Sequence, residues 1–390
     1  MFFSEQLSAT PSRDIKRCVR AEPGHGRQHV GGILYACLCY LYALMKIPFA
    51  GILLLATLLA QQWARISVPT TASLRGLNAV SDKVVWASGS GGTVIRTLDG
   101  GKNWDVLTVA GAQDLDFRGI HGFDANTAVV LSSGPAEKGQ AHIYRTTDGG
   151  KSWQQVIEEN TPGIFLDAVA FWDANHGIVL SDPVNGKFVL FRTEDGGATW
   201  KQVSTPTLPP ALPNEGAFAA SNSCLTVQGK SNVWFATGGA SVARVFRSND
   251  GGETWQVSET PMHPANASSG IFSLYFSDAQ HGLASGGDYQ HPESSNLPSI
   301  MRTTDGGKTW RPAETTDPAG IYFSSVVEAE DRGKAYVIAA GISGLFTGKA
   351  GDRLNKDASE NLNTVAAAGP HGELPWWAVG PKGTIIKRSK

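Results

Sequence analysis

Cysteine is scarce in this 390-residue chain, and three of its four cysteines precede residue 45. Those three are Cys18, Cys37 and Cys39, so Cys224 is alone in the remainder of the chain. A lone cysteine excludes an internal disulfide there, and the expected role of Cys224 is that of a core residue. The stability of this part must therefore come from its hydrophobic core, which a chain of this length can supply.

Charged residues make up only 17% of the chain, and the formal net charge is −2. This balance excludes a general nucleic-acid binder, which needs a basic surface. The sequence also lacks a Walker-type phosphate loop, zinc-ligand spacing and the G-x-S-x-G motif of serine hydrolases. Because no cysteine pair and no histidine cluster follow residue 64, we expect no metal and no cofactor, which argues against a redox function.

Glycine, in contrast, is abundant, with 45 residues, and ten of these glycines belong to a motif that occurs five times. Each copy reads Arg, Ser or Thr, any residue, Asp-Gly-Gly, two residues and Trp. The copies span Arg96–Trp104, Arg145–Trp153, Arg192–Trp200, Arg247–Trp255 and Arg302–Trp310. Their tryptophans are 49, 47, 55 and 55 residues apart. Similarity at such a spacing indicates a repeat architecture.

An apolar run precedes each copy and a strand-like run follows it, which predicts a β-hairpin around Asp-Gly-Gly. The glycines permit positive φ angles, the aspartate can accept bonds from turn amides, and the tryptophan can pack between strands. We therefore interpret these residues as structural: Asp99, Trp104, Asp148, Trp153, Asp195, Trp200, Asp250, Trp255, Asp305 and Trp310. The arginine that opens each copy is expected to cover the sheet with its stem and to pair locally.

The repeat extends upstream of each motif, where two further strand patterns complete a unit of four short strands in about 45 residues, the size of a propeller blade. One of these expected strands is Phe218–Cys224. Five units cover roughly 73–315, and two degenerate units without the motif follow. The last unit has three strands, and residues 65–72 can supply the fourth and close the ring, which removes exposed sheet edges. The prediction is an all-β fold, a seven-bladed β-propeller of four-stranded antiparallel blades in a single domain, 65–390.

The five copies resemble the Asp-box, Ser/Thr-x-Asp-x-Gly-x-x-Trp, of sialidases, some other glycosidases, sortilin-type receptors and photosystem II assembly factors. In those families the box is a structural turn on a propeller blade, and the resemblance implies the same here. A calcium loop is disfavoured because each box offers one carboxylate, whereas calcium needs several oxygen ligands. With its predicted seven blades, 65–390 is most similar to the photosystem II stability/assembly factor family. That resemblance implies a protein-binding scaffold with an arginine-rich surface.

The N-terminal region differs from the repeats. Residues 45–64 read as a secretory signal, with Met45-Lys46, an apolar core Ile47–Ala60 and a small-residue end suited to cleavage after Ala60 or Ala64. Residues 1–44 are then an upstream extension before the true start at Met45. The alternative is an uncleaved membrane anchor over 33–60. In both cases the propeller is expected to be exported, to the periplasm or the extracellular space.

Propeller topology divides the loops between two faces. With strands A to D counted outward from the axis, the A–B and C–D turns share one face, and the boxes are C–D turns. The long loops lie on the other face, where binding is expected. Residues at the starts of strands A should ring the axis there: Arg75, Arg118, Asp167, Ser273, Ser324 and Asn363. Two arginines on adjacent blades could clamp an anionic group, and the alternative is an Arg118–Asp167 salt bridge.

Further candidates lie in the loops of the same face. Asp182 and Asp288 begin B–C loops, and Glu215 closes the proline-rich connection 208–214. These carboxylates could perform acid–base chemistry or simply cap turns. Tyr289, His291 and Arg244 could contact a ligand or a partner. The expected partner is a protein, or a glycan or other anionic ligand, bound opposite the Asp-boxes.

Two functions remain open from the sequence. The first is an exported, non-catalytic propeller that acts as a binding scaffold. The second is a glycoside hydrolase, for which a sialidase resemblance would require an arginine triad, an acid–base aspartate and a tyrosine nucleophile paired with glutamate. The candidates for those roles are Arg75, Arg118 and Arg244, Asp182 or Asp167, and Tyr322 with Glu215. The sialidase Arg-Ile-Pro motif is missing, and sialidases commonly have six blades, so the scaffold is favoured.

Overall fold

The computed structural model describes residues 63–294, 296–313, 320–369 and 372–389. Of the expected N-terminal segments, 1–44 and all but the last two residues of 45–64 lie outside these ranges. The described residues form strands and one short 3-10 helix, η2 (Ala136–Lys138), which follows β7. Within the described ranges, no helix has the length and hydrophobicity that a bilayer crossing requires.

Five consecutive sheets each contain four antiparallel strands in sequence order. The first two sheets are β2 (Leu74–Ala79), β3 (Val85–Gly89), β4 (Thr93–Thr97) and β5 (Asp105–Thr108), then β6 (Phe117–Gly122), β7 (Ala128–Ser132), β8 (Ala141–Thr146) and β9 (Gln154–Glu159). The third and fourth are β10 (Leu166–Phe171), β11 (Gly177–Val184), β12 (Lys187–Thr193) and β13 (Lys201–Gln202), then β14 (Leu225–Gln228), β15 (Asn232–Ala236), β16 (Arg244–Ser248) and β17 (Gln256–Glu259). The fifth is β18 (Ser269–Phe276), β19 (Gly282–Asp288), β20 (Ile300–Thr303) and β21 (Arg311–Pro312).

Two further four-stranded groups complete the set. They are β22 (Ser325–Asp331), β23 (Lys334–Gly341), β24 (Gly344–Lys349) and β25 (Asn355–Ala358), then β26 (Thr364–Ala368), β27 (Glu373–Gly380), β28 (Thr384–Arg388) and β1 (Ala64–Ile66). A single parallel pairing of Glu330 with Glu373 links the two groups into one eight-stranded sheet. Counted by antiparallel pairing, the strands therefore form seven blades.

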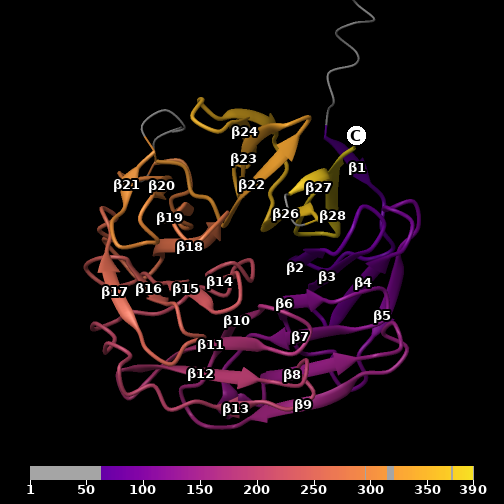
Figure 1. Cartoon of the computed structure of the whole chain (residues 1–390). Coiled ribbons are helices and arrows are strands. Elements are labelled where there is room, and N and C mark those ends of the chain that lie inside the picture. Colours follow the sequence, from indigo (N-terminus) through magenta and orange to yellow (C-terminus); the bar gives the residue numbers. More distant parts are fainter. Residues whose placement is uncertain (1–62, 295, 314–319, 370–371, 390) are drawn as a thin grey trace, which may run out of the picture. The chain divides into compact units, whose positions relative to one another are not determined.

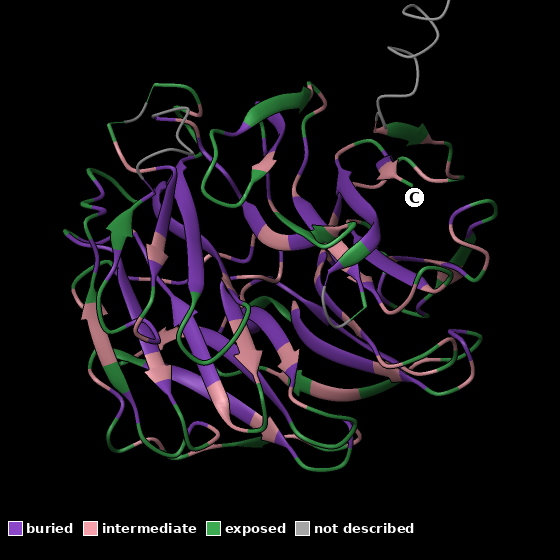
Figure 2. Ribbon diagram, turned by 45° about the horizontal axis from the view of Figure 1, so that its top comes forward, coloured by how far each residue is buried: buried purple, intermediate pink, exposed green. Residues whose placement is uncertain are grey.

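The seven blades surround a common centre. Their innermost strands are β2, β6, β10, β14, β18, β22 and β26 (Figure 1). Seven apolar clusters hold them together, and each cluster is filled by two neighbouring blades. Leu180 of β11 and Phe235 of β15 share one such cluster. Packing between blades buries the inner strands, whereas outer strands such as β5 and β9 are half-buried or exposed (Figure 2). The predicted all-β propeller is confirmed.

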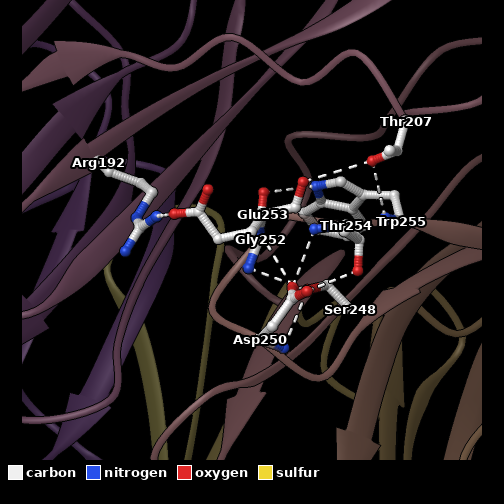
Figure 3. A network of polar contacts seen from close by, with 8 residues as sticks. All are labelled: Arg192, Thr207, Ser248, Asp250, Gly252, Glu253, Thr254 and Trp255. Atoms are coloured by element: carbon white, nitrogen blue, oxygen red, sulfur yellow. Dashed lines mark hydrogen bonds and ion pairs between the residues drawn. The ribbon is translucent and has the colours of Figure 1, made fainter.

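The Asp-boxes are C–D turns, as predicted, and their hydrogen bonds explain the motif. In the first box, Gly101 N donates to Thr97 Oγ1, and both Thr97 Oγ1 and Asn103 N donate to Asp99 Oδ1, each at 2.9 Å. The other four boxes repeat this pattern, and Figure 3 shows it around Asp250 and Ser248 in the fourth blade. Hydrogen bonds from Asn103 lower the pKa of Asp99 to about 2 although the carboxylate is exposed.

Each box also binds the A–B turn of its own blade. A box glycine donates to a carbonyl of that turn in all five cases, for example Gly100 N to Lys83 O at 3.0 Å and Gly149 N to Asn126 O at 2.8 Å. The remaining bonds are Gly196 to Asn175, Gly251 to Ser231 and Gly306 to Gln280. The boxes and the A–B turns therefore share one face, as the strand alternation predicts.

The ring closes through the start of the described chain. Ala64, Arg65 and Ile66 pair with Lys387, Ile386 and Ile385 of β28. Residues 65–72 were expected to supply this strand, and the pairing confirms the closure, although it is limited to Ala64–Ile66. Just before it, the Trp63 ring lies 6.5 Å from that of Trp376 and packs on the cluster between the last two blades.

Trp63 therefore supports closure of the ring. In the full chain, we expect Trp63→Ala to lower the free energy of unfolding by about 1–2 kcal/mol, because a half-buried aromatic face is lost. Trp63→Phe, which keeps an aromatic contact, should lose less. Urea denaturation followed by circular dichroism measures both, and an unchanged midpoint for Trp63→Ala would show that β1 closes the ring without this contact.

Candidate functional site

The centre of the propeller is filled by a segment that the sequence assigned to a strand. Phe218–Cys224 was predicted to be strand A of the fourth blade, and this prediction is wrong, because the strand is β14 (Leu225–Gln228). Asn222 has a φ of 65°, a left-handed conformation that interrupts a strand. Residues 218–223, called the central plug below, instead lie across the inner strands of other blades.

Side chains and backbone carbonyls of the plug bind five other blades. Asn222 pairs with the backbone of Val169, accepting from its N at 2.8 Å and donating to its O at 3.1 Å. Ser221 Oγ donates to Ser324 O at 2.7 Å. The other bonds join Ser223 to Ser273 (2.8 Å), Thr364 to Ser221 O (3.0 Å) and Arg118 to Ala219 O (3.4 Å). These bonds satisfy backbone groups that a buried loop would otherwise leave unpaired.

The plug separates the axis into two environments. Toward the ends of strands A, a cavity of about 260 Å³ is lined by all seven blades, with Ser221, Asn222 and Ser223 of the plug in its wall. His121 also lines this cavity, and burial lowers its pKa to about 4, so its ring is neutral near pH 7. On the other side, near the starts of strands A, lie the predicted arginines.

Arg75 and Arg118 share a carboxylate that the sequence analysis missed. Arg118 Nε donates to Asp116 Oδ2 at 2.7 Å, and Arg75 Nε lies 3.9 Å from the same oxygen. The three side chains are each between 27% and 29% exposed. Burial lowers the pKa of Arg75, and the charge of Arg118 lowers it further. Two guanidinium groups thus face a single carboxylate, which leaves one positive charge for an anionic partner.

An aromatic wall adjoins these arginines. Phe218 of the plug stacks on Phe272 at 3.8 Å between ring centroids, and Tyr322 meets Phe272 edge-on at 4.9 Å. Tyr289 completes the wall, 6.4 Å from Tyr322, and is 42% exposed. Burial raises the pKa of Tyr322, against the opposing charge of Arg75. A nucleophile needs a lowered pKa or an adjacent base, so this environment disfavours Tyr322 as a nucleophile.

Asp167 lies deeper than predicted, beside Asp182. Asp167 is fully buried, and neither of its carboxyl oxygens has a hydrogen-bond partner among the described residues. Burial raises its pKa well above the ordinary range, and the charge of Asp182 adds to this. The salt bridge proposed for Arg118 is formed with Asp116 instead. Asp182 accepts a bond from Ala217 N at 2.9 Å, and burial raises its pKa to about 6.

Glu215 and Arg244 form a buried ion pair with each other. Arg244 Nε donates to Glu215 Oε1 at 2.8 Å, and Arg244 Nη2 contacts Oε2. The Glu215 side chain is 0% exposed and that of Arg244 is 8% exposed. Thr237 and Leu212 N donate to the same carboxylate at 2.6 and 2.8 Å. Because Arg244 also donates to Pro210 O at 2.8 Å, the pair fixes the proline-rich connection and does not face a ligand.

Asp288 is also saturated by its neighbours. Asn266 Nδ2, Ser268 Oγ and Gln290 N donate to it at 3.0, 2.6 and 2.9 Å, and His291 Nδ1 lies 3.0 Å from Oδ2. Burial acts to raise its pKa, but these hydrogen bonds lower it below the ordinary value. Asp288 thus caps its loop, which is the structural alternative to acid–base chemistry that the sequence analysis offered.

Of the predicted residues, the structure brings together Arg75, Arg118, Tyr289 and Tyr322. Glu215 and Arg244 instead pair with each other and do not join this group. Asp116 could have been found from its spacing, because residues two apart on an extended segment share a face and Asp116 stands two before Arg118. The plug had no comparable signal. No group of three or more possible metal ligands occurs in the described ranges.

The fold and the box turns define an Asp-box β-propeller with a plugged axis. Within this class, the chain is similar to the photosystem II assembly factor YCF48: the family model described as "Photosynthesis system II assembly factor YCF48" matches residues 55–165. A comparison with curated proteins gives no match.

Solved structures share the fold at low sequence identity. YCF48 from Cyanidioschyzon merolae is 17% identical, with a TM-score of 0.60 over 84% of this chain and 99% of that chain. YCF48 bound to a D1 peptide is 15% identical, with a TM-score of 0.57 over 84% and 95%. An ancestral GH74 enzyme is 14% identical, with a TM-score of 0.58 over 84% of this chain and 46% of that chain. At these identities the likeness shows the propeller fold alone.

The plug can be tested at Asn222. We expect Asn222→Gly to lower the free energy of unfolding by about 1–3 kcal/mol, because both backbone groups of Val169 lose their partner. Asn222→Ala should cost about 1 kcal/mol more, since alanine tolerates the left-handed conformation poorly. Guanidinium denaturation measures the series. Equal stability of Asn222→Gly and the wild type would show that the plug does not hold the axis.

The raised pKa of Asp182 predicts a pH dependence. A carboxyl whose folded pKa is about 6 binds its proton more tightly in the folded state, so stability is lost as pH rises from about 4 to 6. Asp182→Asn should remove this loss of unfolding free energy. The upper bound for the loss is about 3 kcal/mol, and we expect a smaller value because Asp182 is not fully buried.

The measurement is the unfolding free energy at pH 4.5 and 7. Asp173→Asn is the matched control, since the hydrogen bond from His176 N lowers the pKa of Asp173 to about 2 and its contribution has the opposite sign. Parallel pH profiles for wild type and Asp182→Asn would contradict the assignment.

Proposed function

We propose that this protein is an exported, non-catalytic β-propeller that binds a segment of a partner protein on the face opposite its Asp-boxes. The observation that carries the proposal is the pairing of Arg75 and Arg118 around the single carboxylate of Asp116, beside an aromatic wall. Arginine and tyrosine are the side chains that protein interfaces favour, because both combine apolar area with hydrogen bonding.

The surroundings favour binding over turnover. Glu215 is neutralised by Arg244, and Tyr322 is buried with a raised pKa, so two residues that a sialidase-like mechanism would need are otherwise engaged. A YCF48 structure holds a D1 peptide. From that complex we carry over only the kind of partner, a peptide segment, whose acidic group would meet Arg75 and Arg118.

Glycoside hydrolysis is the second candidate. Its support is the raised pKa of Asp182 near 6, which suits a general acid, and the fold shared with a GH74 enzyme. Such chemistry needs a second carboxylate about 5–10 Å away in an open cleft. The nearby Asp167 is fully buried, which argues against this role.

The test is co-purification of the full chain with its partner from the native cell envelope. We expect the double variant Arg75→Ala, Arg118→Ala to lower partner affinity at least tenfold, because a charge-assisted contact is removed. Arg311→Ala, an exposed arginine on β21, is the matched control and should bind as wild type. Binding that is unchanged in the double variant would contradict the proposed face.

A parallel glycoside screen separates the two functions. No turnover is expected from the wild type. Turnover that is abolished by Asp182→Asn, in a variant that still folds, would replace the scaffold with the hydrolase.

A further inference from the structure

The arginine that opens each Asp-box bridges to the next blade in the first three junctions. Arg96 Nη1 donates to Ala125 O of the second blade at 2.6 Å. Arg145 Nε donates to Gly196 O of the third blade at 2.9 Å. Arg192 Nη1 binds the carboxylate of Glu253 in the box of the fourth blade, as Figure 3 shows. The sequence predicted local pairing, which Arg96 makes with Asp105 of its own blade, but these three arginines also cross between blades.

The Arg192–Glu253 pair shows that a carboxylate fits against a box arginine. Glu253 follows Asp250-Gly251-Gly252 and projects from the box turn toward the preceding blade (Figure 3). At this junction the carboxylate is supplied from within the chain. The fifth blade has a weaker version, in which Arg302 Nη1 lies 3.8 Å from Glu328 Oε1 of the sixth blade.

The junction between the fourth and fifth blades differs from these. Arg247 turns back onto its own blade, donating to Ser258 Oγ and Gln256 Oε1, each at 2.6 Å. No described carboxylate lies within ion-pair distance of its guanidinium. The residue in the fifth box that corresponds to Glu253 is Lys308. A second cation therefore stands where the preceding junction has its anion.

A cavity of about 360 Å³ opens at this junction. Arg247, Lys308, Gln280 and Asn232 line it, and Trp234 contributes its indole. We call it the Arg247 slot. Two of its lining side chains, Arg247 and Lys308, are cationic donors, which suits a negatively charged oxygen ligand.

Among the described residues, no carboxylate that lines the slot pairs with Arg247. Asp305 also lines the slot, but its carboxylate accepts bonds from Thr303, Lys308 N and Thr309 within its own turn. Burial lowers the pKa of Arg247, and the charge of Asp305 only partly opposes this. In the first blade, the position equivalent to Gln256 is Asp105, which binds Arg96 at 3.0 Å. Arg247 thus lacks both carboxylates that other box arginines have.

We propose that the Arg247 slot binds a carboxylate from outside the chain, held by Arg247 and Lys308 in the way that Glu253 is held by Arg192. Arg247 would supply the paired donors and Lys308 the second charge. The slot lies on the Asp-box face, so this site is separate from the Arg75–Arg118 site and does not depend on the proposed function.

The test is NMR titration of the full-length protein with two probes, glutarate and the capped peptide acetyl-Gly-Glu-Gly-amide. We expect saturable shifts of the Trp234 indole signal, because this group lines the slot. Arg247→Gln should weaken binding at least tenfold. Lys308→Glu places an anion at the position of Glu253 in the preceding box and should abolish binding by occupying Arg247.

Lys151→Glu is the matched control, because Lys151 holds the same place in the second box, and Arg96, the box arginine of the preceding blade, is already paired. It should bind as wild type. Tighter binding of the peptide identifies a protein segment as the source of the carboxylate, and tighter binding of glutarate a free dicarboxylate.

The neutral peptide acetyl-Gly-Gln-Gly-amide should not bind. The proposal is overturned if neither acidic probe gives saturable shifts. It is also overturned if the shifts persist in both Arg247→Gln and Lys308→Glu, or if the neutral peptide binds equally well. Partner co-purification that fails while the slot binds glutarate would reject the proposed function and leave this site standing.

Discussion

The hydrogen bonds of the Asp-box turn are the interaction on which the rest of the structure depends. In each box one carboxylate and one hydroxyl organise the turn amides, and a box glycine then binds the A–B turn of the same blade. This fixes strand D and strand B relative to each other at one end of the blade. The boxes are thus structural, and the face that they mark carries the inter-blade arginine contacts.

The axis imposes the second constraint. Seven inner strands leave a central space, and here a serine- and asparagine-rich segment of one blade fills it. The plug satisfies backbone groups of other blades and also carries Phe218 into the aromatic wall beside Arg75. Stability at the axis and the shape of the candidate binding face are therefore coupled through the same residues.

Much of this architecture was predictable because the repeat is local. The box turns and their face follow from residues close in sequence, and the closing strand follows from the three-strand count of the last repeat; each was confirmed. The central plug could not be predicted, because Phe218–Cys224 has the apolar and polar composition of an ordinary inner strand. Its conformation is set by partners such as Val169, Ser324 and Thr364, which come from three different blades.

The sequence by itself determined the seven-bladed ring and the structural role of the five boxes, since turn chemistry acts over a few residues. Only the tertiary structure decided which charges are paired. Glu215 is paired with Arg244, Asp116 is shared by Arg118 and Arg75, and Arg192 is paired with Glu253, whereas Arg247 has no such partner among the described residues. The reason is physical: ion pairing depends on distances of a few ångströms between blades, and the linear order of the chain does not contain these distances.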